Sequence, residues 1–155
     1  MRKKLFSLVA AMLLATVSVM AQNEKGWSYA VETGIGSQWE IGGRAQYGLN
    51  KWVAIDAPVL KYNLDYGDVT GHELKIMAGA RGFSPSFGPN LKAFMAIDLG
   101  YGGCTSEYSD WTSAFAFDLT VGLHVYKNLY VGYGFGMLAN DGKHKDHVLR
   151  VGWNF

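Results

Sequence analysis

The sequence predicts an all-β chain that closes into an eight-stranded antiparallel up-and-down β-barrel. Apolar and polar residues alternate with a period of two in about eight segments of roughly 9–11 residues, which is typical of strands with one apolar and one polar face. Turns rich in Gly, Pro, Asn and Ser separate several of these segments. The last segment, from His147 to Phe155, alternates throughout and stops on an aromatic residue.

The first residues have the composition of an export signal. A cluster of Arg2, Lys3 and Lys4 precedes an apolar run that ends near Met20, and small residues follow at Ala21. This order of a charged region, an apolar region and a Val-x-Ala site predicts a secretory signal peptide over residues 1–21, cleaved after Ala21. The apolar run is short of the roughly 20 residues that a retained membrane helix needs. We therefore expect one mature domain over residues 22–155.

Charge and cysteine content exclude some classes of function. The formal net charge is +1, so we expect no nucleic-acid partner. Cys104 is the only cysteine, and it has no partner for an intramolecular disulfide. An exported domain without disulfides must be stabilised in another way, and closing a barrel provides one. The mature part contains no apolar run long enough for a membrane helix, but barrel strands give only a weak hydropathy signal.

The first three strands are predicted from Trp27 to Ser37, from Gln38 to Tyr47 and from Trp52 to Tyr62. Each has an apolar face, such as Val53, Ile55, Ala57 and Val59 in the third. A tight turn, Gly48-Leu49-Asn50-Lys51, separates the second from the third. Pro58 removes a donor from the hydrogen-bond ladder, so we expect a bulge or the outer rim of the barrel there.

The next two strands are predicted from His72 to Phe83 and from Leu91 to Tyr101, with a turn carrying two prolines between them. The polar segment from Asn63 to Gly71 precedes this pair and is expected to be a loop. The segment from Gly102 to Ser113 follows it as a longer loop, and it contains Cys104, for which we expect no role.

The last three strands are predicted from Ala114 to Tyr126, from Leu129 to Met137 and from His147 to Phe155, with a final polar loop from Ala139 to Asp146. In the seventh strand the face opposite the apolar one carries Gly132, Gly134 and Gly136. No helix follows these glycines, so they are no phosphate loop. We expect them to relieve crowding inside the barrel or to let the strand bend.

The composition of the polar face predicts which face lies inside. It combines many small residues with nearly matched charges, whereas the exterior of a soluble barrel would carry more Lys, Glu and Ser. Aromatic residues of the other face lie mostly near strand ends, as in the interfacial girdles of membrane barrels. We therefore predict a transmembrane barrel whose narrow interior is plugged by ion pairs. The predicted lumen charge network consists of Glu32, Glu40, Arg44, Asp56, Glu73, Lys75, Arg81, Lys92, Asp98, Asp118, His124 and Arg150.

In pattern, the whole mature chain resembles the OmpA/OmpX-type outer-membrane β-barrel domain of Gram-negative bacteria, porin-like in superfamily naming. The one motif is the aromatic end of the closing strand, Trp153 and Phe155. The resemblance implies that these two residues are read by the barrel-insertion machinery. It also implies a monomer in the cell outer membrane, in contact with outer-membrane lipid and lipopolysaccharide. A surface partner would then bind through the loops from Asn63 to Gly71, from Gly102 to Ser113 and from Ala139 to Asp146.

Three functions fit this fold. The favoured one is a non-enzymatic barrel with a structural or surface-interaction role and no cofactor. The second is a lipid A-modifying enzyme of the same fold, which would need a nucleophile, a base and an orienting acid close together. In this chain His124 is the only histidine predicted at the centre of a strand, and it shares a face with Asp118 and Thr120. No serine in the middle of a strand accompanies them as a nucleophile. We therefore expect His124 to be a lumen histidine hydrogen-bonded to a carboxylate.

The third function is a soluble, lipocalin-like binding barrel, with its apolar face inside. A metal site is a further possibility that the residues raise. His144 and His147 flank Asp146 in the last loop, but such pairs on loops are more often incidental, and we predict no metal site.

Overall fold

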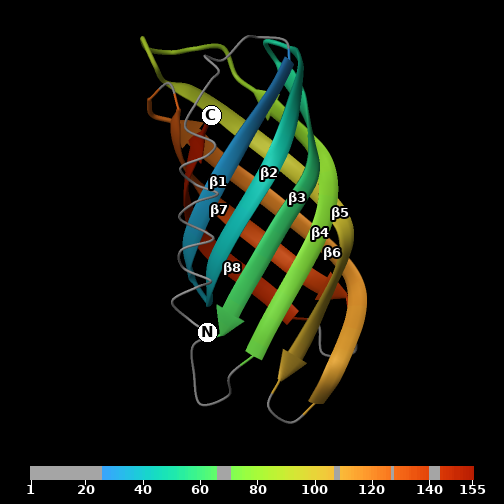
Figure 1. Cartoon of the computed structure of the whole chain (residues 1–155). Helices are drawn as coiled ribbons and strands as arrows, with labels where there is room; N and C mark the ends of the chain where they lie inside the picture. The colour runs from blue at the N-terminus through green and yellow to red at the C-terminus, as the bar shows by residue number, and fades with distance from the viewer. Residues whose placement is uncertain (1–25, 66–70, 107–108, 127, 140–143) are drawn as a thin grey trace.

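The computed structural model describes residues 26–65, 71–106, 109–126, 128–139 and 144–155. The predicted signal peptide therefore lies outside the described residues. The strands are β1 (Gly26–Gly36), β2 (Gln38–Asn50), β3 (Val53–Asp65), β4 (Gly71–Phe83), β5 (Lys92–Ser106), β6 (Ser109–His124), β7 (Leu129–Ala139) and β8 (His144–Asn154). Each strand pairs with the next, and β8 returns to pair with β1, so the sheet closes (Figure 1). The all-β, eight-stranded antiparallel up-and-down barrel that the sequence predicts is confirmed.

The two ends of the barrel differ. At one end lie the start of β1, the end of β8 and the turns β2–β3, β4–β5 and β6–β7. We call it the short-turn end after the β2–β3 and β6–β7 turns of two and four residues, although the β4–β5 turn has eight. The opposite end contains the remaining connections, of which β1–β2 is the single residue Ser37. Among the described residues, no helix is long and apolar enough to cross a membrane.

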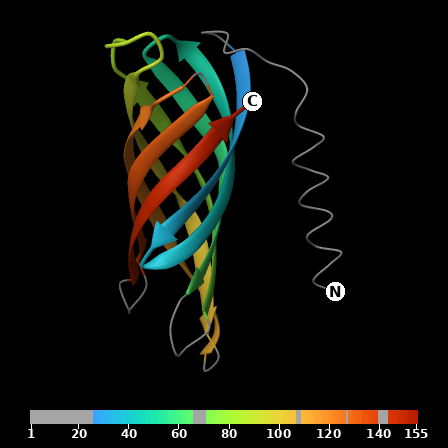
Figure 2. The same cartoon turned by 90° about the vertical axis from the view of Figure 1, so that its left-hand side faces the viewer.

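Strands extend into three of the predicted loops. Gly102, Gly103 and Cys104 pair with Ala114, Ser113 and Thr112, so the segment from Gly102 to Ser113 is mainly the stem of a hairpin. This β5–β6 stem projects from the barrel at the end opposite the short-turn end (Figure 2). Strands likewise enter the predicted loops from Asn63 to Gly71 and from Ala139 to Asp146. Alternation of apolar residues stops where the strands leave the apolar band, but backbone pairing continues, so the sequence pattern underestimates strand length.

Pro58 lies in a β-bulge, as the sequence predicts. Asp56 pairs with Gln46 and Gly79, and the next paired residue, Val59, faces Arg44 and Met77. Two residues of β3, Ala57 and Pro58, therefore oppose one residue on each neighbouring strand. One extra residue inverts the alternation beyond it. The prediction that Val59 faces outward with Ile55 is consequently wrong, because Val59 is buried inside the barrel.

Apolar side chains lie outside and charged side chains lie inside. On β8, Leu149 is 63% exposed and Arg150 is 1% exposed. On β4, Ile76 is 55% exposed and Lys75 is 1% exposed. The soluble, lipocalin-like alternative requires the opposite arrangement, with the apolar face inside. A smaller apolar cluster does occupy the lumen, and its members are Val59, Met77, Ala114, Ala116 and Leu138.

Candidate functional site

The interior of the barrel is organised around Arg150 on β8. Its guanidinium donates to both carboxylate oxygens of Glu40, with Nε–Oε1 at 2.5 Å and Nη2–Oε2 at 2.8 Å. It also donates to both oxygens of Asp118, with Nη1–Oδ1 at 2.8 Å and Nη2–Oδ2 at 2.7 Å. Charge-assisted pairs of this two-pronged kind fix geometry as well as adding energy. Arg150 thus holds two carboxylates in a fixed arrangement at the centre of the lumen.

The partners of Arg150 are not on its neighbouring strands. β8 pairs with β1 and β7, whereas Glu40 is on β2 and Asp118 is on β6. The residues that face Arg150 directly are Gly34 on β1 and Gly132 on β7. A β-carbon at Gly134 would overlap the guanidinium. Gly134 of β7 therefore leaves the space through which Arg150 crosses the lumen.

A second cluster lies closer to the short-turn end. Arg44 Nη1 donates to Glu32 Oε2 at 2.9 Å and to the hydroxyl of Tyr130 at 2.7 Å, and that hydroxyl donates to Glu32. Beside it, Arg81 Nε donates to Asp56 Oδ2 at 2.9 Å. These groups are all buried.

Lys61 joins the two clusters, although the sequence analysis omits it. Its Nζ is 2.8 Å from Asp118 Oδ1 and 3.5 Å from Glu32 Oε1. Counting alternation without a bulge at Pro58 puts Lys61 on the outer face. Allowing one extra residue at Pro58 would have brought it inside.

A third cluster lies toward the end opposite the short-turn end, where Lys75 Nζ is 2.7 Å from Asp146 Oδ2 and also pairs with Glu73. Asn63 Nδ2 donates to Glu73 at 3.0 Å. The sequence analysis assigns Asp146 to a loop and so leaves it out of the network. Asp146 is an even number of residues from Arg150, and residues so spaced on one strand share a face, which is the signal that would have placed Asp146 inside.

Three residues of the predicted network lie apart from these ion pairs. Asp98 is buried with Oδ1 lacking a hydrogen-bond partner, and no ion pair joins it to another described residue. Lys92 is half-buried at the short-turn end, with Nζ 5.4 Å from the ring centroid of Phe83. His124 lies at that end too, as the last residue of β6 and not at its centre.

The predicted hydrogen bond from His124 to a carboxylate is wrong. Neither ring nitrogen has a partner, and the ring packs instead between Phe83 and Phe94, at centroid distances of 5.8 and 5.2 Å. Asp118 shares the inner face but lies six residues away, which is about 20 Å along a strand. Thr120 donates to Asp118 rather than to the histidine. A shared face does not bring residues to the same level of the barrel, so these three do not form a catalytic group.

The residues of the candidate metal site also diverge. Asp146 points inward to Lys75, whereas His147 points outward, with Nδ1 2.5 Å from the hydroxyl of Tyr133. The side chain of His144 lies outside the described part. Among the residues that the structure describes, no group of three or more His, Cys, Asp or Glu side chains could hold a metal ion.

Exposed aromatic side chains gather toward the two ends of the outer surface. At the short-turn end, the rings of Trp27 and Tyr47 are 5.2 Å apart, edge to face. Trp52, Tyr126 and Trp153 are exposed at the same end, and Trp39, Tyr62 and Tyr101 toward the other. Aliphatic residues such as Ile97, Val121 and Val151 occupy the band between them.

No protein-family model matches the chain, and a search of curated proteins finds no match. Solved structures do match. The N-terminal β-barrel domain of Pseudomonas aeruginosa OprF is 16% identical with a TM-score of 0.59, over 86% of this chain and 100% of that one. Neisserial surface protein A is 14% identical with a TM-score of 0.61, over 83% and 92%. Ail, the attachment invasion locus protein of Yersinia pestis, is 13% identical with a TM-score of 0.53, over 84% and 99%. These three are outer-membrane β-barrels of eight strands. At these identities the likeness is one of fold.

Proposed function

We propose that this protein is an integral outer-membrane β-barrel with a non-enzymatic, structural or surface-interaction role. The observation that carries the proposal is the inversion of polarity, with Leu149 and Ile76 outside and Arg150 and Lys75 inside. In water, that outer surface would leave apolar area exposed at roughly 25 cal/mol per Å². Against lipid hydrocarbon, the same surface is matched to its surroundings. Aromatic residues toward both ends of the strands suit the two interfaces of a membrane. Lipid and lipopolysaccharide are thus the expected neighbours.

The lumen in this proposal is plugged and conducts no large solute. Eight strands enclose a space that side chains can fill. Arg150 crosses that space from β8 to β2 and β6, and Lys61 links the level of Asp118 to the level of Glu32. A permeating solute would have to break these pairs, and an unpaired buried ion costs several kcal/mol.

Two aromatic residues at the end of β8 are proposed as a signal for membrane insertion. Trp153 is exposed on the outer face, and Phe155 closes the seam by donating its N–H to the carbonyl of Tyr29 at 2.7 Å. An insertion factor that pairs with the seam would meet both residues.

We place the short-turn end in the periplasm because the strand pairs, above all the β5–β6 stem, extend beyond the barrel at the other end, and bacterial barrels carry their longer excursions on the outer side (Figure 2). The β5–β6 stem would then project from the cell surface and be available to a partner (Figure 2). A non-enzymatic role fits a lumen in which His124 lies at the mouth, about 20 Å along the strand from the hydrogen-bonded pair Asp118 and Thr120.

The test is fractionation of cells that express the protein. We expect it to stay in the outer-membrane fraction after a carbonate wash and to shift its gel mobility on heating. An assay for altered lipid A acylation in a deletion strain should show no change. Release by carbonate would contradict the membrane assignment, and altered acylation would contradict the non-enzymatic role.

A further inference from the structure

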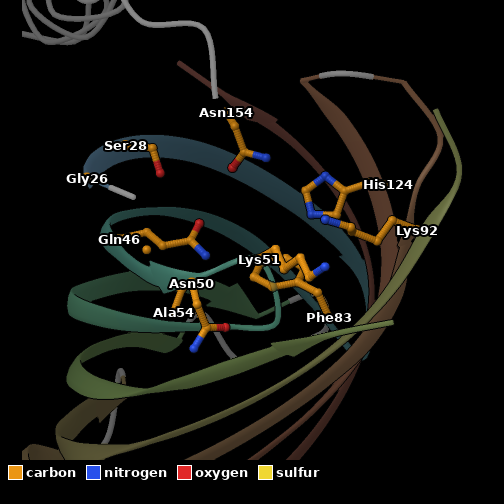
Figure 3. Close-up of a pocket in the computed structure, with 11 residues that line it drawn as sticks. Gly26, Ser28, Gln46, Asn50, Lys51, Ala54, Phe83, Lys92, His124 and Asn154 are labelled. Carbon is orange, nitrogen blue, oxygen red and sulfur yellow. The ribbon is translucent and has the colours of Figure 1, made fainter. Parts of the chain in front are cut away.

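A cavity of about 250 Å³ lies at the short-turn end of the barrel. Its walls come from β1 and β8 at the seam, from β2, β3 and the turn between them, and from the nearby ends of β4, β5 and β6 (Figure 3). At roughly 30 Å³ per molecule the space would hold about eight waters. Pockets for drug-sized ligands start at about 300 Å³, so only a small ligand fits.

The charge of this cavity is of one sign. Lys92 and Lys51 line it, the Lys51 amine lying 4.9 Å from the ring centroid of Trp52, and no residue that lines it is acidic. No carboxylate among the described residues pairs with Lys92, and the aromatic ring of Phe83 is its neighbour instead. The rest of the described lumen is the reverse, with more buried carboxylates than buried lysines and arginines. A positive charge without a counter-ion is thus confined to this end.

His124 supplies a donor without a partner. Its side chain is 7% exposed, and neither ring nitrogen makes a hydrogen bond. In either protonation state an imidazole carries at least one N–H, and a buried donor left unsatisfied is costly. Figure 3 shows the ring and the Lys92 side chain lying together on one wall of the cavity. An acceptor bound between them would satisfy both.

Neutral donors complete the set. Asn154 accepts from Arg44 Nη2 at 3.2 Å through its side-chain oxygen, which leaves its amide nitrogen as a donor. Ser28 and Gln46 line the opposite wall (Figure 3). Two buried rings lie beside His124, with Phe94 5.2 Å from His124 and 5.5 Å from Tyr130. A ligand bound here would lie beside the Arg44 cluster, because Arg44 donates to both Asn154 and Tyr130.

From this arrangement we propose that the cavity binds a small oxyanion, a free phosphate or carboxylate. Lys92 and His124 bind its oxygens, Asn154 and Gln46 orient it, and Lys51 attracts it at the rim. Binding depends only on these residues. That the ligand would come from the periplasm rests on the proposed function, which places the short-turn end there.

The test uses the purified full-length mature barrel, folded in a nonionic, phosphate-free detergent. Inorganic phosphate and, separately, succinate are titrated in at constant ionic strength against chloride. The observed signals are the ring nitrogens of His124 and the amine of Lys92, followed by NMR. We expect saturable shifts at both residues with at least one probe and none with chloride. If the shifts saturate with phosphate alone or with succinate alone, the ligand class is phosphate or carboxylate, respectively.

Variants decide whether the named residues carry the binding. Lys92→Gln and His124→Phe should each weaken it by about tenfold or more, the usual worth of a charge-assisted hydrogen bond. Phenylalanine keeps a ring among Phe83 and Phe94, so His124→Phe should still fold, and heat-shifted gel mobility checks this. The matched control is Lys145→Gln, which removes an exposed lysine of β8 near the opposite end and should change nothing.

Two results would overturn the proposal. One is the absence of saturable shifts with both probes. The other is equal weakening by Lys92→Gln and Lys145→Gln, because that would indicate unspecific charge attraction. Neither result bears on carbonate extraction, so the proposed membrane location would stand or fall separately.

Discussion

The guanidinium of Arg150 on β8 lies where a side chain of Gly134 on β7 would begin. It passes over the missing side chain and reaches Glu40 on β2 and Asp118 on β6. The closing strand is consequently tied across the lumen, beyond the strands that pair with it. The glycine and the arginine act as a pair, because one provides the space that the other fills.

Gly134→Ala should destabilise the barrel. The added β-carbon must displace the Arg150 guanidinium, and overpacking of this kind typically costs roughly 1–3 kcal/mol. The free energy of unfolding can be measured by urea titration of the barrel in lipid vesicles. Gly82→Ala is the control, because a β-carbon there meets nothing closer than the carbonyl oxygen of Trp52 at 4.0 Å. Equal stability of the two variants would contradict the role given to Gly134.

Arg150→Ala should destabilise the barrel more strongly. It leaves Glu40 and Asp118 buried without their cation, and breaking a buried ion pair from one side costs roughly 3–5 kcal/mol. Lys145→Ala, on the exposed face of the same strand, should be nearly neutral. Unchanged stability of Arg150→Ala would show that the pairs across the lumen carry little energy.

The same variant tests whether the lumen is plugged. In planar bilayers, neither the unmodified protein nor Arg150→Ala should show stable, porin-sized conductance, because Lys61 and the Arg44 cluster still cross the space. Steady single-channel currents of porin size from the unmodified protein would end the plugged-lumen proposal.

Alternation of residues was enough to predict the strands and most of their faces. Glu73, Lys75 and Arg81 lie inside as expected, since β4 is regular from Gly71 to Phe83. In β3 the alternation identified Pro58 as irregular but not the phase beyond it, so Val59 was misplaced and Lys61 missed. A single inserted residue changes the face of every residue after it until another irregularity intervenes.

The level of each residue along the barrel could not be predicted from one strand. His124 and Asp118 share a face, and only the pairing of β5, β6 and β7 shows that one lies at the mouth and the other at the centre. The partners of Arg150 could not be predicted for the same reason: carboxylates on the neighbouring strands are the simple expectation, and the structure places them on β2 and β6. The Arg150 side chain reaches β2 and β6 because glycines in the intervening strands β1 and β7 leave space for it. Which glycines lie beside Arg150 can be identified only from the strand register.

Phe155→Asp should reduce assembly in cells. If the outer aromatic residues at the end of β8 are an insertion signal, outer-membrane fractions will contain less heat-modifiable folded barrel, whereas Phe155→Tyr will be close to normal. Refolding of Phe155→Asp into vesicles without cellular factors should succeed, because the hydrogen bonds between Phe155 and Tyr29 use backbone atoms. A variant that fails equally in vesicles would show a defect of the seam, and normal assembly in cells would remove the signal.

The central claim is that the band of apolar side chains faces hydrocarbon, and one matched pair of substitutions tests it most directly. Val121 lies within β6 and Val125 just beyond its end, and they are 45% and 37% exposed. Urea unfolding in lipid vesicles should show that Val121→Arg costs roughly 2–4 kcal/mol and Val125→Arg roughly 0–1, the dependence on depth known for membrane barrels. Both substitutions would be mild on a surface that faces water. Equal, small losses at the two positions would contradict the membrane barrel.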